Sequence, residues 1–409
     1  MTTQTAPEPP RMPRLFAAQG STLAEHHARF GELPSVGAAL IPMLTEAGLS
    51  GRGGAGFPSG RKMASVTGSK PVVVGNGSEG EPLSRKDAQL LTRAPHLVLD
   101  GLDAAAAAVG ADKVYLYVHS EAAPMVARAL DERRAAGLDP NRVTVVEAPD
   151  RFVAGEESAA IRKIEGGPAL PRDRTVLATK SGVRGRPTLV NNVETLAHMA
   201  LIARFGSEWF RSVGDADDPG TMLVTYSGAL HKHGVVEVPT GTLLTGLLEH
   251  AGGTDPATLS AVLIGGYHGS WLPATTFAGT RLSRSGLKSL GASPGAGILH
   301  ALGLTECGLA HTAEIAGYLA EQSARQCGPC LNGLPRIAEL LTELAHGRAN
   351  DQLVKEIRRV TGLVDGRGSC RHPDGTARMI GSALRTFAAD IELHQRRRCT
   401  AVEGFSPAG

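Results

Sequence analysis

The chain has 409 residues, more than one hydrophobic core usually serves, so its length predicts two or three domains. Basic and acidic residues nearly balance at a formal net charge of +2, which argues against a nucleic-acid-binding surface. The alanine-rich stretch 102–110 is too short to span a bilayer, and no charged and apolar leader opens the chain. We therefore expect a soluble, cytoplasmic protein.

Residues 1–30 begin with Thr, Gln, Pro and Glu, and we expect a disordered tail without chemistry. An apolar helical pattern at 40–48 then leads into a segment with five glycines within residues 51–60. Because glycine lacks Cβ, such a loop lets backbone N–H groups approach an anion directly, and phosphate is the obvious candidate. A flexible surface loop would show the same glycines, but it would need neither Phe57 nor Lys62.

Helix and strand patterns alternate after this loop. Strands are expected at 72–75, 113–119 and 142–147, and helices at 93–109 and 121–136. The alternation predicts a Rossmann-like α/β domain over residues 31–218, with a parallel sheet covered on both faces. Ligand sites in such sheets lie beyond the carboxyl ends of the strands, which places the polar segment 76–82 at a binding position.

Two later segments carry polar residues at the start of predicted helices. Glu156 and Glu157 open a helix at 158–164, where the helix dipole favours acids and is a sufficient structural explanation for them. Acids in dinucleotide sites also accept hydrogen bonds from a ribose, so a binding role stays open. Asn191 and Asn192 precede the next helix, where they serve as an N-cap, as amide contacts for a ligand, or as both.

The composition changes near residue 218. Strands are expected at 222–228, 234–239 and 259–266 and a helix at 242–250, which predicts a small β-grasp-like domain over residues 219–296 with a scaffolding or docking role. From residue 297 the pattern is helical, and a helical bundle is expected over 297–396, before a tail at 397–409. Its four helices are expected at 298–325, 335–347, 351–361 and 376–396.

All five cysteines lie in the last quarter of the chain. An odd number crowded at one end indicates a metal or cluster site rather than a disulfide framework. Cys327 and Cys330 form a Cys-x-x-Cys pair, and Cys370 follows 40 positions after Cys330. On these residues alone, zinc and a redox pair both remain open.

Several of these motifs agree with one family in order and spacing. The glycine loop, the segment 76–82, Gly155-Glu156-Glu157 and Asn191-Asn192-Val193-Glu194-Thr195 resemble the flavin- and NADH-binding subunit of bacterial respiratory complex I. Related diaphorase subunits of hydrogenases and formate dehydrogenases share the pattern, and the resemblance covers roughly residues 35–395. It implies an NADH dehydrogenase in which NADH gives a hydride to FMN, which passes electrons to a 4Fe–4S cluster.

The resemblance also implies the site and the partner. Electrons would leave to an iron–sulfur partner subunit or a ferredoxin, in a quinone- or ferredoxin-linked chain, and Glu157 would repel the extra phosphate of NADP. The implied cluster ligands are Cys327, Cys330 and Cys370. The implied cofactor-binding residues are Gly51, Gly53, Gly54, Gly56, Phe57, Lys62, Asn76, Glu79, Glu81, Phe152, Gly155, Glu156, Glu157, Asn191, Asn192 and Thr195.

The iron–sulfur motif departs from the family pattern. Relatives have Ser-Cys-Gly-x-Cys-x-Pro-Cys, and Ala324 stands here in place of the first cysteine. Three thiolates therefore remain of the four that such clusters normally use. Cys307 is a poor substitute because it would lie roughly 25 Å away along a straight helix. His372 could ligate, but we expect it to be a satisfied surface histidine.

The residues expected around NADH and the flavin also depart from the family pattern. Of the aromatic positions that surround NADH in relatives, only Phe57 survives, and the others fall on Ser65 and Leu177. An acid of the flavin segment has become Ser78. Two rival hypotheses follow: an electron relay or scaffold that has lost NADH oxidation, and a zinc-stabilised interaction protein, which the flavin motifs disfavour.

Overall fold

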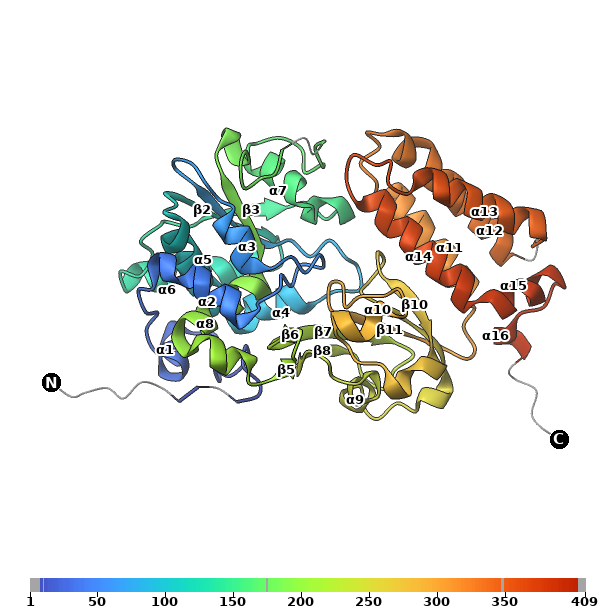
Figure 1. The fold of residues 1–409 in the computed structure, drawn as a ribbon, viewed down its shortest axis with the longest axis horizontal. Coiled ribbons are helices and arrows are strands. Elements are labelled where there is room, and N and C mark those ends of the chain that lie inside the picture. Colours follow the sequence, from blue (N-terminus) through green and yellow to red (C-terminus); the bar gives the residue numbers. More distant parts are fainter. Residues whose placement is uncertain (1–7, 10, 174–175, 347–348, 404–409) are drawn as a thin grey trace. The chain divides into compact units, whose positions relative to one another are not determined.

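The computed structural model describes residues 8–9, 11–173, 176–346 and 349–403 (Figure 1). The chain divides into two compact units. The first comprises residues 1–80, 84–224 and 235–241, and the second comprises residues 81–83, 225–234 and 242–409. No helix in the described ranges is long and apolar enough to cross a bilayer.

A four-stranded parallel sheet forms the centre of the first unit, in the order β3-β2-β1-β4. The predicted parallel sheet is thereby confirmed. Its strands are β1 (Val72–Gly77), β2 (Lys113–His119), β3 (Thr144–Ala148) and β4 (Thr188–Asn192). The helices of this unit are α1 (Leu23–Phe30), α2 (Leu40–Ala47), α3 (Ser59–Ala64), α4 (Lys86–Arg93), α5 (Pro95–Val109), α6 (Ala123–Ala135), α7 (Glu157–Ile164) and α8 (Val193–Arg211).

Helices cover both faces of this sheet. Successive side chains of a strand point to opposite faces, so each face has its own core. Val73 and Leu116 belong to a core that includes residues of α5 and α8. Val74 and Tyr117 point to the other face and pack in a smaller core with Ala160 of α7. Since both faces are buried at the centre of the sheet, β1 and β2 contain nearly continuous apolar runs.

The expectation of a disordered tail fails for residues 11–30. Leu15 and Phe30 are buried in the first core, and α1 begins with a reciprocal capping box between Thr22 and Glu25. Arg14 is also buried, and its guanidinium donates to the carbonyl oxygen of Phe210. The polar start of the chain suggested disorder, but the apolar residues further along supply enough burial to order this segment.

The second unit contains a mixed sheet in the order β10-β9-β11-β7-β8, whose strands β7 and β8 continue into the first unit. Its strands are β7 (Thr221–Gly228), β8 (Gly234–Pro239), β9 (Leu259–Ile264), β10 (Ser270–Pro273) and β11 (Ile298–Gly303). Strand β11 runs parallel to β7 and antiparallel to β9. Short helices α9 (Leu244–His250) and α10 (Arg284–Lys288) accompany it, and β5 (Gly214–Asp215) pairs with β6 (Asp218–Pro219) in the first unit.

The expected helix at 298–325 is wrong at its start, where the chain forms β11. A short apolar run fits a buried strand as well as a buried helix, and here two neighbouring strands supply its hydrogen bonds. The helical region itself is confirmed, and α16 lies within the segment expected to be a tail. Its helices are α11 (Gly308–Glu321), α12 (Leu334–Ala345), α13 (Asp351–Val364), α14 (His372–Thr386), α15 (Ala388–Gln395) and α16 (Thr400–Glu403).

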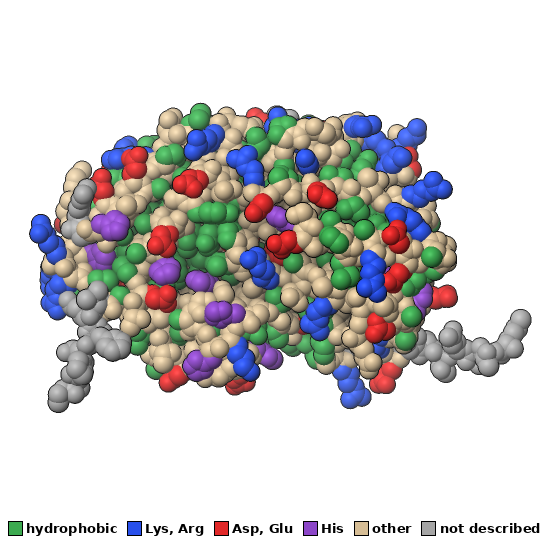
Figure 2. All heavy atoms as spheres, turned by 180° about the vertical axis from the view of Figure 1, so that it is seen from behind, with side chains coloured by type: hydrophobic (Ala, Val, Ile, Leu, Met, Phe, Trp, Pro, Cys, Tyr) green, Lys and Arg blue, Asp and Glu red, His purple; other side chains and the backbone are tan. Residues whose placement is uncertain are grey.

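Charges are mixed on the surface. Figure 2 shows Lys and Arg side chains interspersed with Asp and Glu over the described residues of the face in view, and histidines gathered toward its lower left. This distribution agrees with the near-neutral composition of the chain.

A buried carboxylate fastens the helices of the first unit. Asp100 on α5 is 3% exposed, and its side chain lies 2.7 Å from His26 Nε2 and 2.7 Å from Arg133 NH1. Arg204 donates to the same carboxylate at 2.5 Å. Burial alone would raise the pKa of Asp100, but His26, Arg204 and Arg133 outweigh it and lower that pKa.

Replacing Asp100→Asn should lower the free energy of unfolding by about 3–5 kcal/mol, because buried guanidinium groups would lose their carboxylate. Because the pKa of Asp100 is lower in the folded state, its stabilisation is present at neutral pH and is lost as the pH falls. The wild-type advantage should therefore shrink on acidification. Urea unfolding followed by tryptophan fluorescence measures both effects. Glu339→Gln, in an exposed pair with Arg336, is the control and should cost less than about 1 kcal/mol; equal losses in the two variants would contradict the account.

Candidate functional site

The segments expected to bind a cofactor in the first unit meet at the carboxyl edge of its sheet. Strands β1 and β4 are neighbours, with Asn76 opposite Asn192. The Asn76 amide donates to the carbonyl oxygen of Gly155 at 2.9 Å, which joins the Gly155-Glu156-Glu157 segment to this edge. A Cβ on Gly53 would lie 3.1 Å from the Asn192 Cβ, so the glycine loop passes closely over the same edge.

The glycine loop is a closed turn. The Gly51 N–H donates to the Phe57 carbonyl at 2.9 Å. Gly54 and Gly56 have φ angles of +102° and +60°, which only glycine adopts without strain. Phe57 remains 49% exposed at the end of the turn. This geometry is that of an ordered turn, whereas the alternative interpretation was a flexible surface loop.

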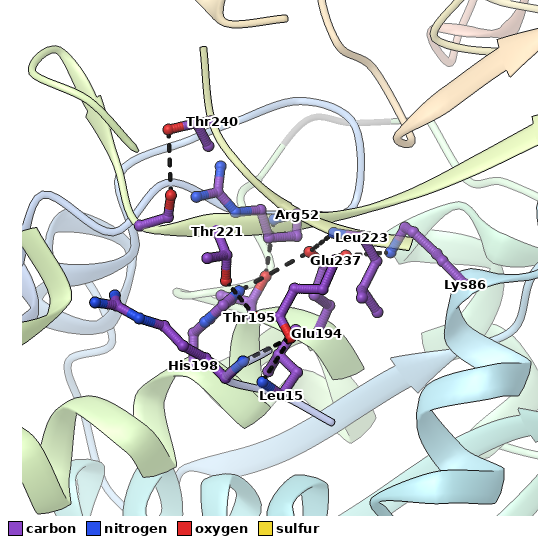
Figure 3. Close-up of polar contacts among 12 residues, drawn as sticks. Leu15, Arg52, Lys86, Glu194, Thr195, His198, Thr221, Leu223, Glu237 and Thr240 are labelled. Carbon is purple, nitrogen blue, oxygen red and sulfur yellow. Dashed lines mark hydrogen bonds and ion pairs between the residues drawn. The ribbon is translucent and has the colours of Figure 1, made fainter. Parts of the chain in front are cut away.

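Two contacts from Arg52 position the loop (Figure 3). Its backbone N–H donates to Thr195 Oγ1 at 2.9 Å, and its buried guanidinium lies 3.1 Å from Asp218 Oδ1. Thr195, expected to bind a cofactor, thus holds the loop against α8. Sequence reasoning missed Arg52 and Asp218, although a cation inside a glycine run was a visible signal.

A second buried cation lies at the start of α4. Lys86 is 2% exposed, and its Nζ lies 2.7 Å from Asp87, 2.9 Å from Glu194 and 3.3 Å from Asn192 Oδ1. Glu194 also accepts the Leu223 N–H at 2.8 Å (Figure 3). Burial would lower the pKa of Lys86, but the Asp87 and Glu194 carboxylates outweigh burial and raise it. Lys86 therefore stays charged and joins α4 to α8.

Lys62 was expected to contact the FMN phosphate and Glu157 the NADH nucleotide, and in the structure the two side chains form an ion pair. Lys62 Nζ lies 2.8 Å from Glu157 Oε1 and donates to the Val190 carbonyl at 2.6 Å. The two side chains are 26% and 28% exposed, so a ligand anion can reach the pair. The carboxylate of Glu157 consequently has a cation beside it.

The two adjacent asparagines differ in their contacts. Asn192 is the N-cap of α8: its Oδ1 accepts the Glu194 N–H at 3.0 Å, and its Nδ2 donates to Asp87 at 2.6 Å. Asn191 is 6% exposed, and its buried Nδ2 has no hydrogen-bond partner among the described residues. Asn191 thus has a free donor, whereas Asn192 is used by the fold.

Three expected ligand acids have structural partners. Glu79 accepts the Asp87 N–H at 3.0 Å at the start of α4, and burial raises its pKa, with a contribution from Asp87. Glu156 is the N-cap of α7, and its carboxylate accepts the Ser158 and Ala159 N–H groups. Glu81 belongs to the second unit, where it accepts the Tyr267 N–H at 2.8 Å.

Phe152 lies in a short 3-10 helix, Phe152–Gly155. A Cβ on Gly80 would lie 2.7 Å from the Phe152 carbonyl oxygen, so the polar segment after β1 passes directly against this helix. The close approach explains why glycine stands at position 80.

The second unit brings the three expected cluster cysteines toward one another. Cys330 lies in a π-helical turn, Pro329–Gly333. Burial and the neighbouring thiols of Cys327 and Cys370 raise the pKa of Cys330 to about 12. Ala324 adds no ligand atom. The other two cysteines, Cys307 and Cys399, lie with His394 in a separate group.

His372 is buried rather than on the surface. One ring nitrogen lies 2.8 Å from the Leu319 carbonyl oxygen, and the other lies 3.2 Å from His268. Both nitrogens are therefore engaged. The expectation of a satisfied histidine is confirmed, and its expected surface position is wrong.

Comparisons with known proteins agree with this geometry. Residues 44–201 match the family model of the Nuo51 FMN-binding domain, and residues 310–394 match that of the NADH-ubiquinone oxidoreductase-F iron–sulfur binding region. The F 2 subunit of the NADH-quinone oxidoreductase of Rhizobium meliloti (strain 1021) is 30% identical over 380 residues, covering 88% of this chain and 90% of the relative. The F subunit of the Streptomyces coelicolor NADH-quinone oxidoreductase is 30% identical over 372 residues, covering 87% of this chain and 82% of the relative.

A solved structure is also similar. An NAD+-reducing NiFe hydrogenase in its H2-reduced state superposes with a TM-score of 0.79 at 30% identity, covering 88% of this chain. This chain spans 62% of the length of that hydrogenase chain. The similarities to the curated relatives extend over nearly their whole length, and the expected family is confirmed. The chain belongs to the family of FMN-binding, iron–sulfur F subunits of NADH-quinone oxidoreductases.

Proposed function

We propose that this chain is the electron-entry subunit of a larger oxidoreductase, an NADH dehydrogenase that carries FMN and a 4Fe–4S cluster. The observation that carries the proposal is the unpaired, buried Asn191 amide at the carboxyl edge of the sheet. This amide follows Val190, whose carbonyl accepts from Lys62, and it lies within the FMN-binding match. A buried donor without a partner is costly unless a ligand satisfies it.

The chain's residues fit FMN in a specific way. The glycine turn allows backbone N–H groups to approach the phosphate, and Lys62 supplies a nearby cation. Asn191 would donate to the flavin, while Asn76, Asn192 and Thr195 hold the surrounding segments. Bound FMN would supply the redox chemistry, accepting a hydride from NADH and releasing single electrons toward the cluster.

The nicotinamide nucleotide would bind beside the glycine turn. Because Phe57 is half exposed there, one aromatic ring remains on which a base can stack. The Arg61 guanidinium lies 5.7 Å from the centre of this ring. The positions of the lost rings are Ser65, whose hydroxyl donates to the Lys62 carbonyl, and Leu177, which is 71% exposed. Each lost ring–base contact would remove about 1–3 kcal/mol, so NADH should bind more weakly than in relatives with those rings.

The alternative function is an electron relay or scaffold that has lost NADH oxidation. It is favoured by the Lys62–Glu157 ion pair, which occupies two side chains needed for nucleotide and phosphate binding. It is also favoured by the missing rings and by Ala324. The two functions differ in whether NADH reduces the bound flavin.

Partner and location are proposals as well. We propose an iron–sulfur partner subunit or ferredoxin as the electron acceptor, in a quinone- or ferredoxin-linked chain. The β-grasp-like domain at 219–296 would serve as scaffold or docking surface. None of the five cysteines, all of which lie in the described ranges, forms a disulfide, which suits the reducing cytoplasm that we propose as the location.

The flavin site is tested with Asn191→Asp, which keeps the shape of the side chain and replaces its N–H donor. FMN should bind about ten- to a hundredfold more weakly to this variant, as expected when a buried hydrogen bond is lost and an acceptor is left unpaired. Fluorescence titration of apoprotein with FMN measures the change, and chromatography of acid-released flavin identifies the cofactor. Asn332→Asp, with the same change at an exposed position, is the control. A wild-type protein that takes up no FMN refutes the proposal.

Donor selectivity is tested with Glu157→Gln. The variant removes the negative charge that would oppose the NADP phosphate and releases Lys62, so the kcat/KM ratio of NADPH to NADH should rise about tenfold or more. Stopped-flow bleaching of the flavin measures both donors. Glu147→Gln removes an exposed carboxylate of the same unit and should leave the ratio unchanged. An unchanged ratio in Glu157→Gln would show that Glu157 does not set the donor preference.

Cluster ligation is tested with Ala324→Cys. With Cys327, Cys330 and Cys370 as the protein ligands, one iron would lack a cysteine, so we expect an oxygen-labile cluster isolated partly in a three-iron form. Ala324→Cys should raise the iron content toward four per chain and reduce the three-iron EPR signal. Ala338→Cys adds a thiol on α12 and is the control. Absence of iron in both wild type and Ala324→Cys, prepared anaerobically, would rule out the cluster.

A further inference from the structure

A second group of metal-ligating side chains lies outside the expected iron–sulfur site. Cys307 is the N-cap residue of α11, His394 lies near the end of α15, and Cys399 directly precedes α16 (Figure 1). Their ligand atoms all lie within 4.8 Å of one another, and Cys307 Sγ is 3.5 Å from His394 Nε2. Among the described residues, no other group of three such side chains converges this closely.

The imidazole of His394 is already oriented for a metal. The side chain is 4% exposed, and its Nδ1 lies 3.2 Å from the Leu344 carbonyl oxygen. A carbonyl oxygen can only accept, so Nδ1 carries the proton and Nε2 presents its lone pair toward Cys307. Metal-ligating histidines almost always donate their other ring N–H to a carbonyl or carboxylate in this way.

A carboxylate lies one helical turn before this histidine. Asp390 precedes His394 by four residues on α15, a spacing that places both on one side of the helix. Its Oδ1 is buried and has no hydrogen-bond partner among the described residues. The backbone N–H of Thr400, next to Cys399, donates a hydrogen bond to this carboxylate. A metal or its bound water would satisfy this oxygen.

We propose that Cys307, His394 and Cys399 bind one Zn2+ ion, with the fourth position filled by Asp390 or by a water molecule that Asp390 holds. Two thiolates and an imidazole around a small tetrahedral ion are a ligand set typical of zinc. Binding would displace the protons of both thiols and change no oxidation state. The site is independent of the FMN and iron–sulfur proposals.

The ion would fasten the end of the chain. Cys399 and α16 follow the exposed arginines at 396–398, whereas Cys307 precedes α11 and His394 lies on α15. Because α16 has only four residues, local structure contributes little to holding it. Zinc would join this segment to two helices at once.

The full-length protein, purified anaerobically with a thiol reductant, tests the site by elemental analysis. We expect about one zinc per chain in the wild type and a loss of at least about fivefold in Cys399→Ser, since each ligand contributes to a structural site. Cys327→Ser is the matched control: it should keep its zinc and lose iron. Zinc-edge X-ray absorption of Cys327→Ser should show two sulfur ligands at about 2.3 Å and nitrogen or oxygen ligands at about 2.0–2.1 Å.

Limited trypsin digestion gives a second readout. Cleavage within Arg396–Arg398 should be at least about tenfold faster in Cys399→Ser than in Cys327→Ser, because loss of the ion releases the segment. Wild type without zinc would overturn the proposal. Zinc that is lost in Cys327→Ser but retained in Cys399→Ser would place the ion at the cluster cysteines instead. A Cys307–Cys399 disulfide found by mass spectrometry in zinc-free protein would also overturn it.

Discussion

The buried ammonium group of Lys86 is the contact on which the rest of the candidate flavin site depends. It lies between Asp87, Glu194 and the Asn192 amide oxygen, so it connects the start of α4 with the start of α8. Asn192 in turn lies against Gly53, and Thr195 holds the Arg52 N–H. Without that charge, the two buried carboxylates would lose the ammonium group that they share, at a cost of several kcal/mol.

This framework divides the polar residues at the sheet edge between two tasks. Asn192, Thr195, Glu79 and Glu156 cap helices or hold loops, and their hydrogen-bonding groups are used within the protein. Asn191 keeps a free donor, and the Lys62–Glu157 pair remains accessible to a ligand. A small set of side chains can therefore contact cofactors, while a larger set keeps their positions fixed.

Much of this fold follows from periodicity in the sequence. Strands β2 and β8 have the predicted bounds, and the parallel sheet follows from its alternating pattern. Strand β11 was missed because a short, mostly apolar segment does not distinguish a central strand from a helix. Residues 11–30 were missed because their order depends on distant partners, such as the carbonyl oxygen of Phe210 for Arg14.

The sequence indicated which segments meet at the sheet edge, but not how their side chains pair. Motif order placed the glycine loop and the asparagines at one edge, as found. Local spacing could not show that Lys62 pairs with Glu157, or that Cys307 and Cys399 meet His394 across 87 and 5 positions. Such pairs depend on how helices pack, which sequence separation does not reveal.

This chain takes electrons from NADH through a bound flavin. The most direct test is the visible spectrum of anaerobically purified protein, recorded before and after NADH is added. Flavin absorption should bleach within the time of mixing when NADH is added, and it should return when an electron acceptor is supplied. A flavin band that NADH leaves unchanged at about 1 mM, near the upper end of ordinary KM values, would contradict it.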